Sequence, residues 1–457
     1  MRYNSAMIDR QPPHGRLLHR GGADYEAARL NAVWNGRKPD REPEQILLAA
    51  TAEDVVWGVR HAAFEGLRVS VRSGGHSWYG NCLRAGALLL DLSALTEISV
   101  DPRAMVASVG PGTLGRDLDA ALADRGLFFP IGHCATVGLG GFALGGGYGW
   151  NSRTRGPAGL NIRAIDVVLA NGEHVHADDS THPELLWAAR GAGPGFFGVV
   201  TRFHFELCPR PRMLRTGDVY PLDVHDEVLA WALALAPSLP PEVEVSARVG
   251  YSARVGAPAL TLTGMAFAPD PDTGAPADPA ALLEPLGTCP VVHRALDRFS
   301  IPIQRLPDLH DRGGGDAPSL RWNVDGIWTH SGAAEIIPAA VAAGLKDVPP
   351  GEHSFVLWML WGHHEERPNA CWSMQAPLYL SPNAGWEDPA EDERHGRWVD
   401  DALRDLESHS CGVQFSDANL PVRPGQGLSP GNARWLEELR PTYDPDGLFC
   451  SYLLGPE

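Results

Sequence analysis

The sequence has no apolar run of the roughly 18 residues that a membrane-spanning helix requires. Its first residues, 1–9, also lack the apolar segment of a secretory signal peptide. Internal repeats and low-complexity tracts are absent as well. From these absences we expect a globular protein without a membrane partner, located in the cytoplasm.

Positive charge is scarce. There are 38 Lys and Arg residues against 56 Asp and Glu, which gives a formal net charge of -18, and no basic stripe is present. Because such a chain repels polyanions, we expect no nucleic-acid partner. The hydrophobic content of 44% is ordinary for a globular protein and leaves enough chain to bury a sizeable core. A small molecule is the expected partner.

The seven cysteines are scattered and do not form the close pairs that bind zinc or define a disulfide framework. We therefore expect no metal centre, and six of the seven are expected to be buried thiols. Cys134 differs because it lies among glycines, where little apolar bulk can cover it.

What the chain does have is two glycine-rich segments, residues 72–80 (RSGGHSWYG) and residues 132–149 (GHCATVGLGGFALGGGYG). Glycine lets main-chain N–H groups approach phosphate oxygens closely and adopts positive φ without strain. His76 and Cys134, one in each segment, are nucleophiles that can bond to a flavin ring. The pairing predicts a flavin site. His133, beside the cysteine, is a candidate base for the thiol.

The first half of the chain reads as alternating strands and helices. Thr51 is a plausible N-cap of a helix that runs to about residue 64, and residues 68–71 and 88–92 are predicted strands. Residues 113–125 are predicted to be a helix, and residues 126–149 one long loop.

A β-hairpin is predicted around Asn171-Gly172, followed by a helix over 184–190 and a strand over 199–207. After a linker at 208–211, strands are expected at 243–249, 260–268 and 355–361, loops at 269–285 and 306–318, and a helix from 391 onward.

The chain resembles the flavin oxidases typified by the berberine bridge enzyme, within the vanillyl-alcohol oxidase superfamily. The resemblance covers nearly the whole chain and is carried by residues 72–77, 132–141, 145–149, 197–201, 386–389 and 443–446. It implies an α+β fold of two domains. Residues 1–208 would form the FAD-binding domain from two α/β subdomains. Residues 209–410 would form a substrate domain of antiparallel sheet covered by helices, and residues 411–457 would return to the FAD domain.

The resemblance also implies FAD bonded twice, through His76 to the 8α-methyl group and through Cys134 to ring carbon 6. The further residues expected to bind the cofactor are Arg72, Ser73, Gly74, Gly75, Ser77, Gly80, Val137, Gly138, Gly141, Gly145, Gly149 and Val200.

The expected base is where the chain departs from its relatives. Many of them carry a Tyr-x-Asn-Tyr/Phe segment before the C-terminal helix, whereas residues 412–417 here read GVQFSD, without tyrosine. Tyr148, beside the glycines, and Tyr452, in the tail, are the proposed catalytic replacements. Residues 363–365 (HHE), after a predicted strand, are a third possibility.

Together these features predict an oxidase that removes two electrons from a hydroxyl or amine of a bulky secondary metabolite and reduces O2 to H2O2. A carbohydrate oxidase, a flavin dehydrogenase or cyclase that does not use O2, and a flavin-binding protein without activity are the alternatives. A nicotinamide dehydrogenase is disfavoured because no helix is expected after the second glycine segment. The substrate and the oligomeric state stay open.

Overall fold

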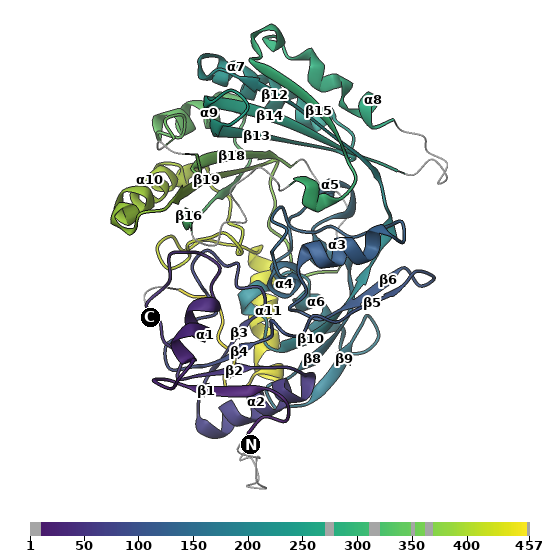
Figure 1. Cartoon of the computed structure of the whole chain (residues 1–457), viewed down its shortest axis with the longest axis vertical. Coiled ribbons are helices and arrows are strands. Elements are labelled where there is room, and N and C mark those ends of the chain that lie inside the picture. The colour runs from purple at the N-terminus through teal and green to yellow at the C-terminus, as the bar shows by residue number, and fades with distance from the viewer. Residues whose placement is uncertain (1–10, 270–277, 310–319, 349–351, 362–368, 455–457) are drawn as a thin grey trace.

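The computed structural model describes residues 11–269, 278–309, 320–348, 352–361 and 369–454. The molecule is elongated, with a large sheet and its covering helices in the upper half of Figure 1 and two smaller sheets in the lower half. The expected α+β fold is confirmed. Within the described residues, no helix combines the length and apolarity needed to cross a membrane.

The first small sheet has four strands in the order β1-β2-β4-β3, with β2, β4 and β3 parallel. Its strands are β1 (Arg16–His19), β2 (Gln45–Leu48), β3 (Val69–Arg72) and β4 (Leu88–Asp91), accompanied by α1 (Tyr25–Asn31) and α2 (Ala52–Glu65). Thr51 caps α2 as predicted. Its side chain accepts from the N–H of Asp54, and the Asp54 carboxylate accepts from the N–H of Thr51 at 2.9 Å, which completes a capping box.

The second small sheet is antiparallel, in the order β5-β6-β10-β8-β9. Its strands are β5 (Ile98–Asp101), β6 (Val106–Val109), β8 (Ile162–Val168), β9 (His174–Ala177) and β10 (Val199–Glu206), with α3 (Gly115–Ala123) and α6 (Pro183–Ala189) beside them. The predicted hairpin is confirmed, because β8 and β9 pair antiparallel across Asn171-Gly172, and Gly172 has φ +75°. The predicted linker at 208–211 instead contains β11 (Cys208–Pro209), which pairs with β7 (Leu127–Phe128).

The upper sheet has eight antiparallel strands. They are β12 (Arg212–Tyr220), β13 (Val243–Ser252), β14 (Ala257–Ala268), β15 (Asp297–Ile303), β16 (Arg321–Val324), β17 (Ile327–Thr329), β18 (Phe355–Leu360) and β19 (Leu378–Trp386). The flanking helices are α7 (His225–Leu235), α8 (Pro279–Leu283), α9 (Ala333–Ala342) and α10 (Asp392–Asp405).

Alternation along these strands separates two faces of the upper sheet. Apolar side chains such as Ala247, Leu262 and Trp358 pack against α7, α9 and α10 in one buried cluster. The residues between them point the other way, and that second face is the one that contributes to the site described below.

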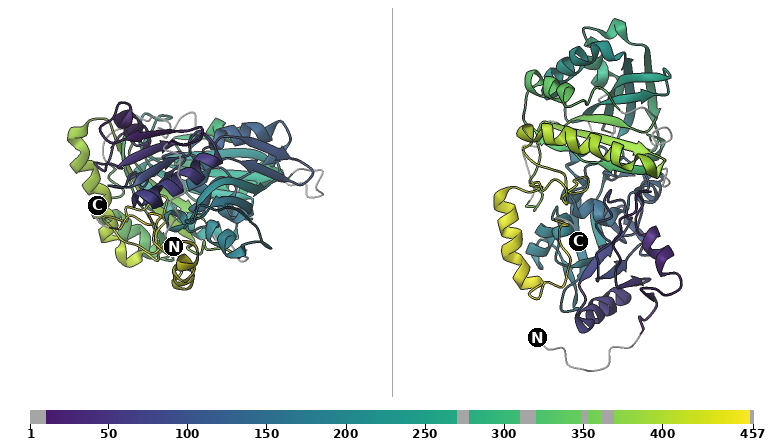
Figure 2. Two further views of the ribbon diagram at one scale, coloured as in Figure 1. Left: turned by 90° about the horizontal axis from the view of Figure 1, so that it is seen from below. Right: turned by 90° about the vertical axis from the view of Figure 1, so that its left-hand side faces the viewer.

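The C-terminal segment crosses back to the lower half, where α11 (Pro430–Tyr443) lies along its flank (Figure 2). Beyond α11, Phe449 forms a parallel bridge with Val69, and the N–H of Cys450 donates to the Val69 carbonyl at 2.7 Å. The division at residues 208 and 410 stays a prediction, and these contacts support the predicted return of the tail.

Two loop predictions were wrong in part. Residues 126–149 contain a short helix, α4 (Leu139–Leu144), because glycine can adopt helical φ and ψ and so does not prevent a helix. A second short helix, α5 (Ser152–Arg155), follows. The argument that no helix follows these glycines therefore fails. The predicted loop at 269–285 includes α8, whose N-cap Asp278 accepts from the N–H of Ala280.

Candidate active site

A cavity of about 830 Å³ lies between the glycine-rich segments and the second face of the upper sheet. Both segments contribute glycines to it, together with side chains that include His76 and Cys134. The sheet contributes side chains from alternate positions, among them Ser246, Arg248, Met265, Leu357, Tyr379 and Ser381. Its volume is at the upper end of the roughly 300–1,000 Å³ typical of ligand pockets, so it can hold a large ligand.

The two glycine-rich segments meet backbone to backbone at Gly74 and Gly138. A Cβ atom on Gly74 would lie 2.5 Å from the Gly138 nitrogen, and one on Gly138 would lie 2.6 Å from the Gly74 Cα. No side chain fits at either position. The contact fixes the spacing of the segments, while Ser73 accepts from the N–H of Gly141 at 3.1 Å.

His76 and Cys134 come together on the cavity wall through Thr136. The Thr136 hydroxyl lies 3.0 Å from His76 Nε2 and 3.5 Å from Cys134 Sγ. Trp34 stacks on the His76 ring at 4.7 Å and so restricts its orientation. Two nucleophiles that are 58 positions apart in the sequence therefore flank one threonine (134 minus 76). His133, the suggested base, also lines the cavity and contacts Trp150 edge to face at 4.5 Å.

Of the other predicted cofactor residues, ten line the cavity: Arg72, Ser73, Gly74, Gly75, Ser77, Val137, Gly138, Gly141, Gly145 and Val200. Gly80 and Gly149 are not part of the lining. A Cβ atom on Gly80 would meet Pro39 at 2.9 Å, and one on Gly149 would meet the Ile131 carbonyl at 2.1 Å, so local packing explains both glycines.

A flavin dinucleotide fits this lining. Backbone from both glycine-rich segments provides amides for phosphates, and apolar Val137 and Val200 offer contacts for a flat ring. The Arg72 guanidinium, which was expected to bind the cofactor, forms an ion pair with Asp91 at 2.9 Å. Arg72 therefore lines the cavity and also holds β3 to β4.

The two predicted tyrosine bases lie in different surroundings. Tyr148 lines the cavity, where its hydroxyl donates to the Met374 carbonyl at 2.6 Å and accepts from Trp372 Nε1 at 2.8 Å. Tyr452 is outside the lining. Its hydroxyl donates to the Ala192 carbonyl at 2.7 Å, and burial raises the pKa of its phenol. Residues 363–365 lie outside the described residues.

The motif comparison missed a carboxylate in the segment that replaces the family's tyrosine. Asp417 lines the cavity, accepting from Trp78 Nε1 at 3.0 Å on one oxygen and from the Tyr379 hydroxyl at 3.0 Å on the other. Burial raises the pKa of the Asp417 carboxyl, against the two hydrogen bonds that lower it. The sequence shows Asp417 at the end of residues 412–417, but only the fold brings Tyr379 into contact with it.

The far part of the upper sheet adds charged groups to the wall. Burial raises the pKa of Glu244 to about 7, while the backbone N–H of Arg153 donates to its carboxylate. Arg215 and Arg248 line the same cavity, and burial lowers the pKa of both guanidinium groups, that of Arg248 to about 10. Arg248 donates to the Tyr251 carbonyl at 3.4 Å and lies over the Phe355 ring at 4.3 Å. Arg215 lies over the Phe299 ring at 5.6 Å. Neither arginine has an acidic partner among the residues that the structure describes.

The comparisons with known proteins agree with this site. A family model described as an FAD binding domain matches residues 43–178, which include both nucleophiles and the Gly74–Gly138 contact. The fold and the cavity thus define an FAD-binding oxidoreductase.

The FAD-linked oxidoreductase nodO of Hypoxylon pulicicidum is 33% identical over 437 residues, covering 94% of this chain and 95% of that protein. The structure of 6-hydroxy-D-nicotine oxidase from Arthrobacter nicotinovorans superimposes with a TM-score of 0.82 at 23% identity, covering 99% of this chain and 100% of the other. BBE-like 1 of Physcomitrella patens gives 0.81 at 20% identity, covering 97% of each chain. The chain belongs to the FAD-linked oxidoreductases and has the berberine bridge enzyme-like fold that its glycine motifs predict.

Proposed function

We propose that this enzyme is an oxidase that holds FAD covalently through His76 and Cys134. It removes two electrons from a hydroxyl or amine of a bulky small molecule, a secondary metabolite, and transfers them to O2 to form H2O2. The observation that carries the proposal is the placement of His76 and Cys134 on either side of Thr136, on the wall of a cavity large enough for a dinucleotide.

Attachment would balance with O2, the oxidant of the proposed reaction. At each site the protein would lose an N–H or S–H hydrogen, the flavin would lose a C–H hydrogen, and one N–C or S–C bond would form. O2 would take up the two protons and two electrons released per bond as H2O2. Two attachments hold the ring without a closed pocket, which suits a bulky substrate.

We assign proton removal from the substrate to Asp417 with Tyr379. When bound, FAD supplies the acceptor for the hydride that leaves the substrate carbon. The oxygen or nitrogen on that carbon loses its proton at the same time, so a base must lie within hydrogen-bond reach. Asp417 faces the cavity, and burial raises the pKa of its carboxyl, which makes the carboxylate a stronger base than that of an exposed aspartate. Tyr379 donates to it and keeps its second oxygen oriented. Tyr148 remains the alternative base on the same wall.

We further propose that the substrate carries an acidic group. Arg215 and Arg248 are half-buried on the cavity wall and have no acidic partner among the described residues, and a positive charge partly withdrawn from water without an opposite charge is costly. A substrate carboxylate or phosphate would compensate it through bidentate hydrogen bonds. Its reacting carbon would then lie toward Asp417.

The attachment is tested by denaturing the purified protein in acid and measuring flavin fluorescence on the precipitated chain. Intact-mass spectrometry should show one added FAD, and peptide mapping should place it on His76 and Cys134. His76→Ala and Cys134→Ala should each retain FAD through the remaining bond, and the double variant should release it. Free flavin from the wild-type protein would disprove covalent attachment.

The activity is tested by screening alcohols, lactols and amines, with and without a carboxylate, for peroxide release. Anaerobic bleaching of the flavin by a compound that releases no peroxide in air would identify a dehydrogenase instead. Absence of bleaching by every class would contradict the oxidase proposal, whatever the state of the flavin.

A further inference from the structure

A row of polar side chains crosses the five-stranded sheet on the face opposite the flavin cavity. Ser108 on β6, His204 on β10, Asp166 on β8 and His176 on β9 belong to four strands that are neighbours in that order. Ser108 pairs directly with His204, and Asp166 pairs directly with His176. Phe203, the residue before His204, lines the cavity, so alternation turns the His204 ring away from it.

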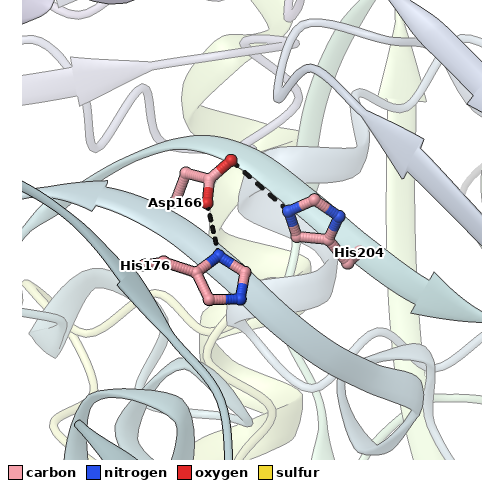
Figure 3. A group of neighbouring side chains, drawn as sticks. All are labelled: Asp166, His176 and His204. Atoms are coloured by element: carbon pink, nitrogen blue, oxygen red, sulfur yellow. Dashed lines mark hydrogen bonds and ion pairs between the residues drawn. The ribbon is translucent and has the colours of Figure 1, made fainter. Parts of the chain in front are cut away.

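Both imidazole rings point at the one carboxylate (Figure 3). His176 Nδ1 lies 2.6 Å from one oxygen of Asp166, and His204 Nε2 lies 3.3 Å from the other. The ligand atoms that the three residues offer all lie within 4.8 Å of one another. The two nitrogens and the carboxylate therefore lie close enough together to bind one small cation, at ligand distances of about 2.0–2.2 Å, once the hydrogen bonds to Asp166 open.

The outer surroundings orient these rings. The Ser108 hydroxyl lies 2.8 Å from His204 Nδ1, the nitrogen turned away from Asp166, and an Asp178 oxygen lies 3.9 Å from His176 Nε2. Partners on the far nitrogen of a histidine ligand fix its tautomer and raise its basicity. Every residue of the row sits on a paired strand, so the backbone positions of the three ligands are fixed.

The cluster is also accessible from solvent. The side chain of His176 is 49% exposed and that of Asp166 is 27% exposed, so an ion can enter from solvent and keep water ligands.

We propose that Asp166, His176 and His204 form a binding site for a divalent transition-metal ion of the zinc type. Imidazole and carboxylate ligands suit Zn²⁺, Co²⁺ and Ni²⁺, and three protein ligands leave one or more positions for water. The bound ion links β8, β9 and β10, so its effect is to stabilise this sheet. The cysteine spacing gave no reason to expect such a site, because its ligands are separate in the sequence and include no thiol.

The full-length protein, freed of tags and stripped of metal, is titrated with Co²⁺ while the d–d absorption at wavelengths beyond the flavin bands is followed. Zn²⁺ affinity is then measured by competition with a chromophoric chelator. We expect saturation at one ion per chain, with Zn²⁺ displacing Co²⁺ and raising Tm.

Two variants separate metal binding from simple hydrogen bonding. His176→Gln removes the imidazole but keeps a side chain that can donate to Asp166. Ser108→Ala removes only the hydrogen-bond partner of His204 and should lower the Zn²⁺ affinity by roughly 10- to 100-fold. We expect His176→Gln to lower that affinity more than Ser108→Ala does. His293→Ala, at an exposed histidine elsewhere, should bind like the wild type.

Far-ultraviolet circular dichroism and Tm without metal show whether each variant is folded. Should His176→Gln not fold, the Co²⁺ spectrum of the wild type and peptide mapping of zinc-protected histidines decide the question. Wild-type protein that does not bind the ion, or a folded His176→Gln variant with wild-type affinity, overturns the proposal. Neither result depends on flavin attachment or on a substrate.

Discussion

Replacing Asp417 by Asn tests the assignment of the base most directly. Asn has nearly the same shape and can still accept from one donor, but it cannot take up a proton. Asp417 is held by two hydrogen bonds of 3.0 Å, from Trp78 and Tyr379, so the variant should keep the fold of the cavity wall. The loss of a general base costs about 100- to 10,000-fold in rate, and we expect flavin reduction to slow by that range.

The pH dependence of the same reaction has a predicted sign. At pH values below its pKa, Asp417 is protonated and cannot accept the substrate proton, so the rate should fall as the pH is lowered through that value. This fall in rate is the acid limb of the pH profile. Because burial raises the pKa of Asp417, the acid limb should lie above the pH range that is ordinary for an aspartate. Asp417→Asn should remove the limb altogether.

Tyr379→Phe gives a second, graded change. The variant removes one hydrogen bond to the carboxylate, worth about 1.5–3 kcal/mol. Because that hydrogen bond stabilises the ionised carboxylate, its loss should raise the pKa of Asp417 further. The acid limb should move to higher pH, whereas the rate on the plateau above it should change less.

The assay is anaerobic stopped-flow reduction of the flavin, over roughly pH 5 to 9, with a substrate from the peroxide screen. Tyr148→Phe, Tyr452→Phe and Glu244→Gln are the matched comparisons. An acid limb that persists in Asp417→Asn, with an unchanged rate, would refute the reasoning. If Glu244→Gln removed the limb instead, the base would lie at the other end of the wall.

Three further predictions concern the cofactor, the fold and the substrate. Gly138→Ala places a Cβ atom 2.6 Å from the Gly74 Cα, so we expect the protein to be destabilised by about 1–3 kcal/mol and to contain less FAD. Urea unfolding measures the stability, and flavin absorbance measures the FAD content. Gly287→Ala is the control, because its Cβ would meet no atom within 4 Å. Thr51→Ala removes the capping box of α2 and should lower the free energy of unfolding by about 1 kcal/mol, whereas Thr51→Ser should not; equal stability of all three proteins contradicts the cap. Arg248→Leu should raise KM for an acidic substrate by roughly 10- to 150-fold, because a charged hydrogen bond contributes about 1.5–3 kcal/mol. KM for the methyl ester of that substrate should not change. Equal effects on both compounds would argue against anion recognition.

The local elements were predictable where one short pattern is sufficient. Thr51 followed by acidic residues specified the start of α2, and Asn171-Gly172 specified the hairpin, because a cap and a tight turn depend on a few consecutive residues. The segment around α4 was mispredicted because glycine content alone does not exclude a short helix, which here is stabilised by packing. Propensity is a weak guide where tertiary contacts contribute more.

The sequence by itself determined the family and the fold class, and it singled out His76 and Cys134 as the proposed flavin ligands, because both stand in motifs whose backbone geometry requires glycine. It could not determine which side chains share the cavity wall. Tyr379 meets Asp417, and His204 meets Asp166, only through strand register and the crossing of distant segments. The tertiary structure alone decided those contacts, since hydrogen bonds act over about 3 Å in space and are indifferent to separation along the chain.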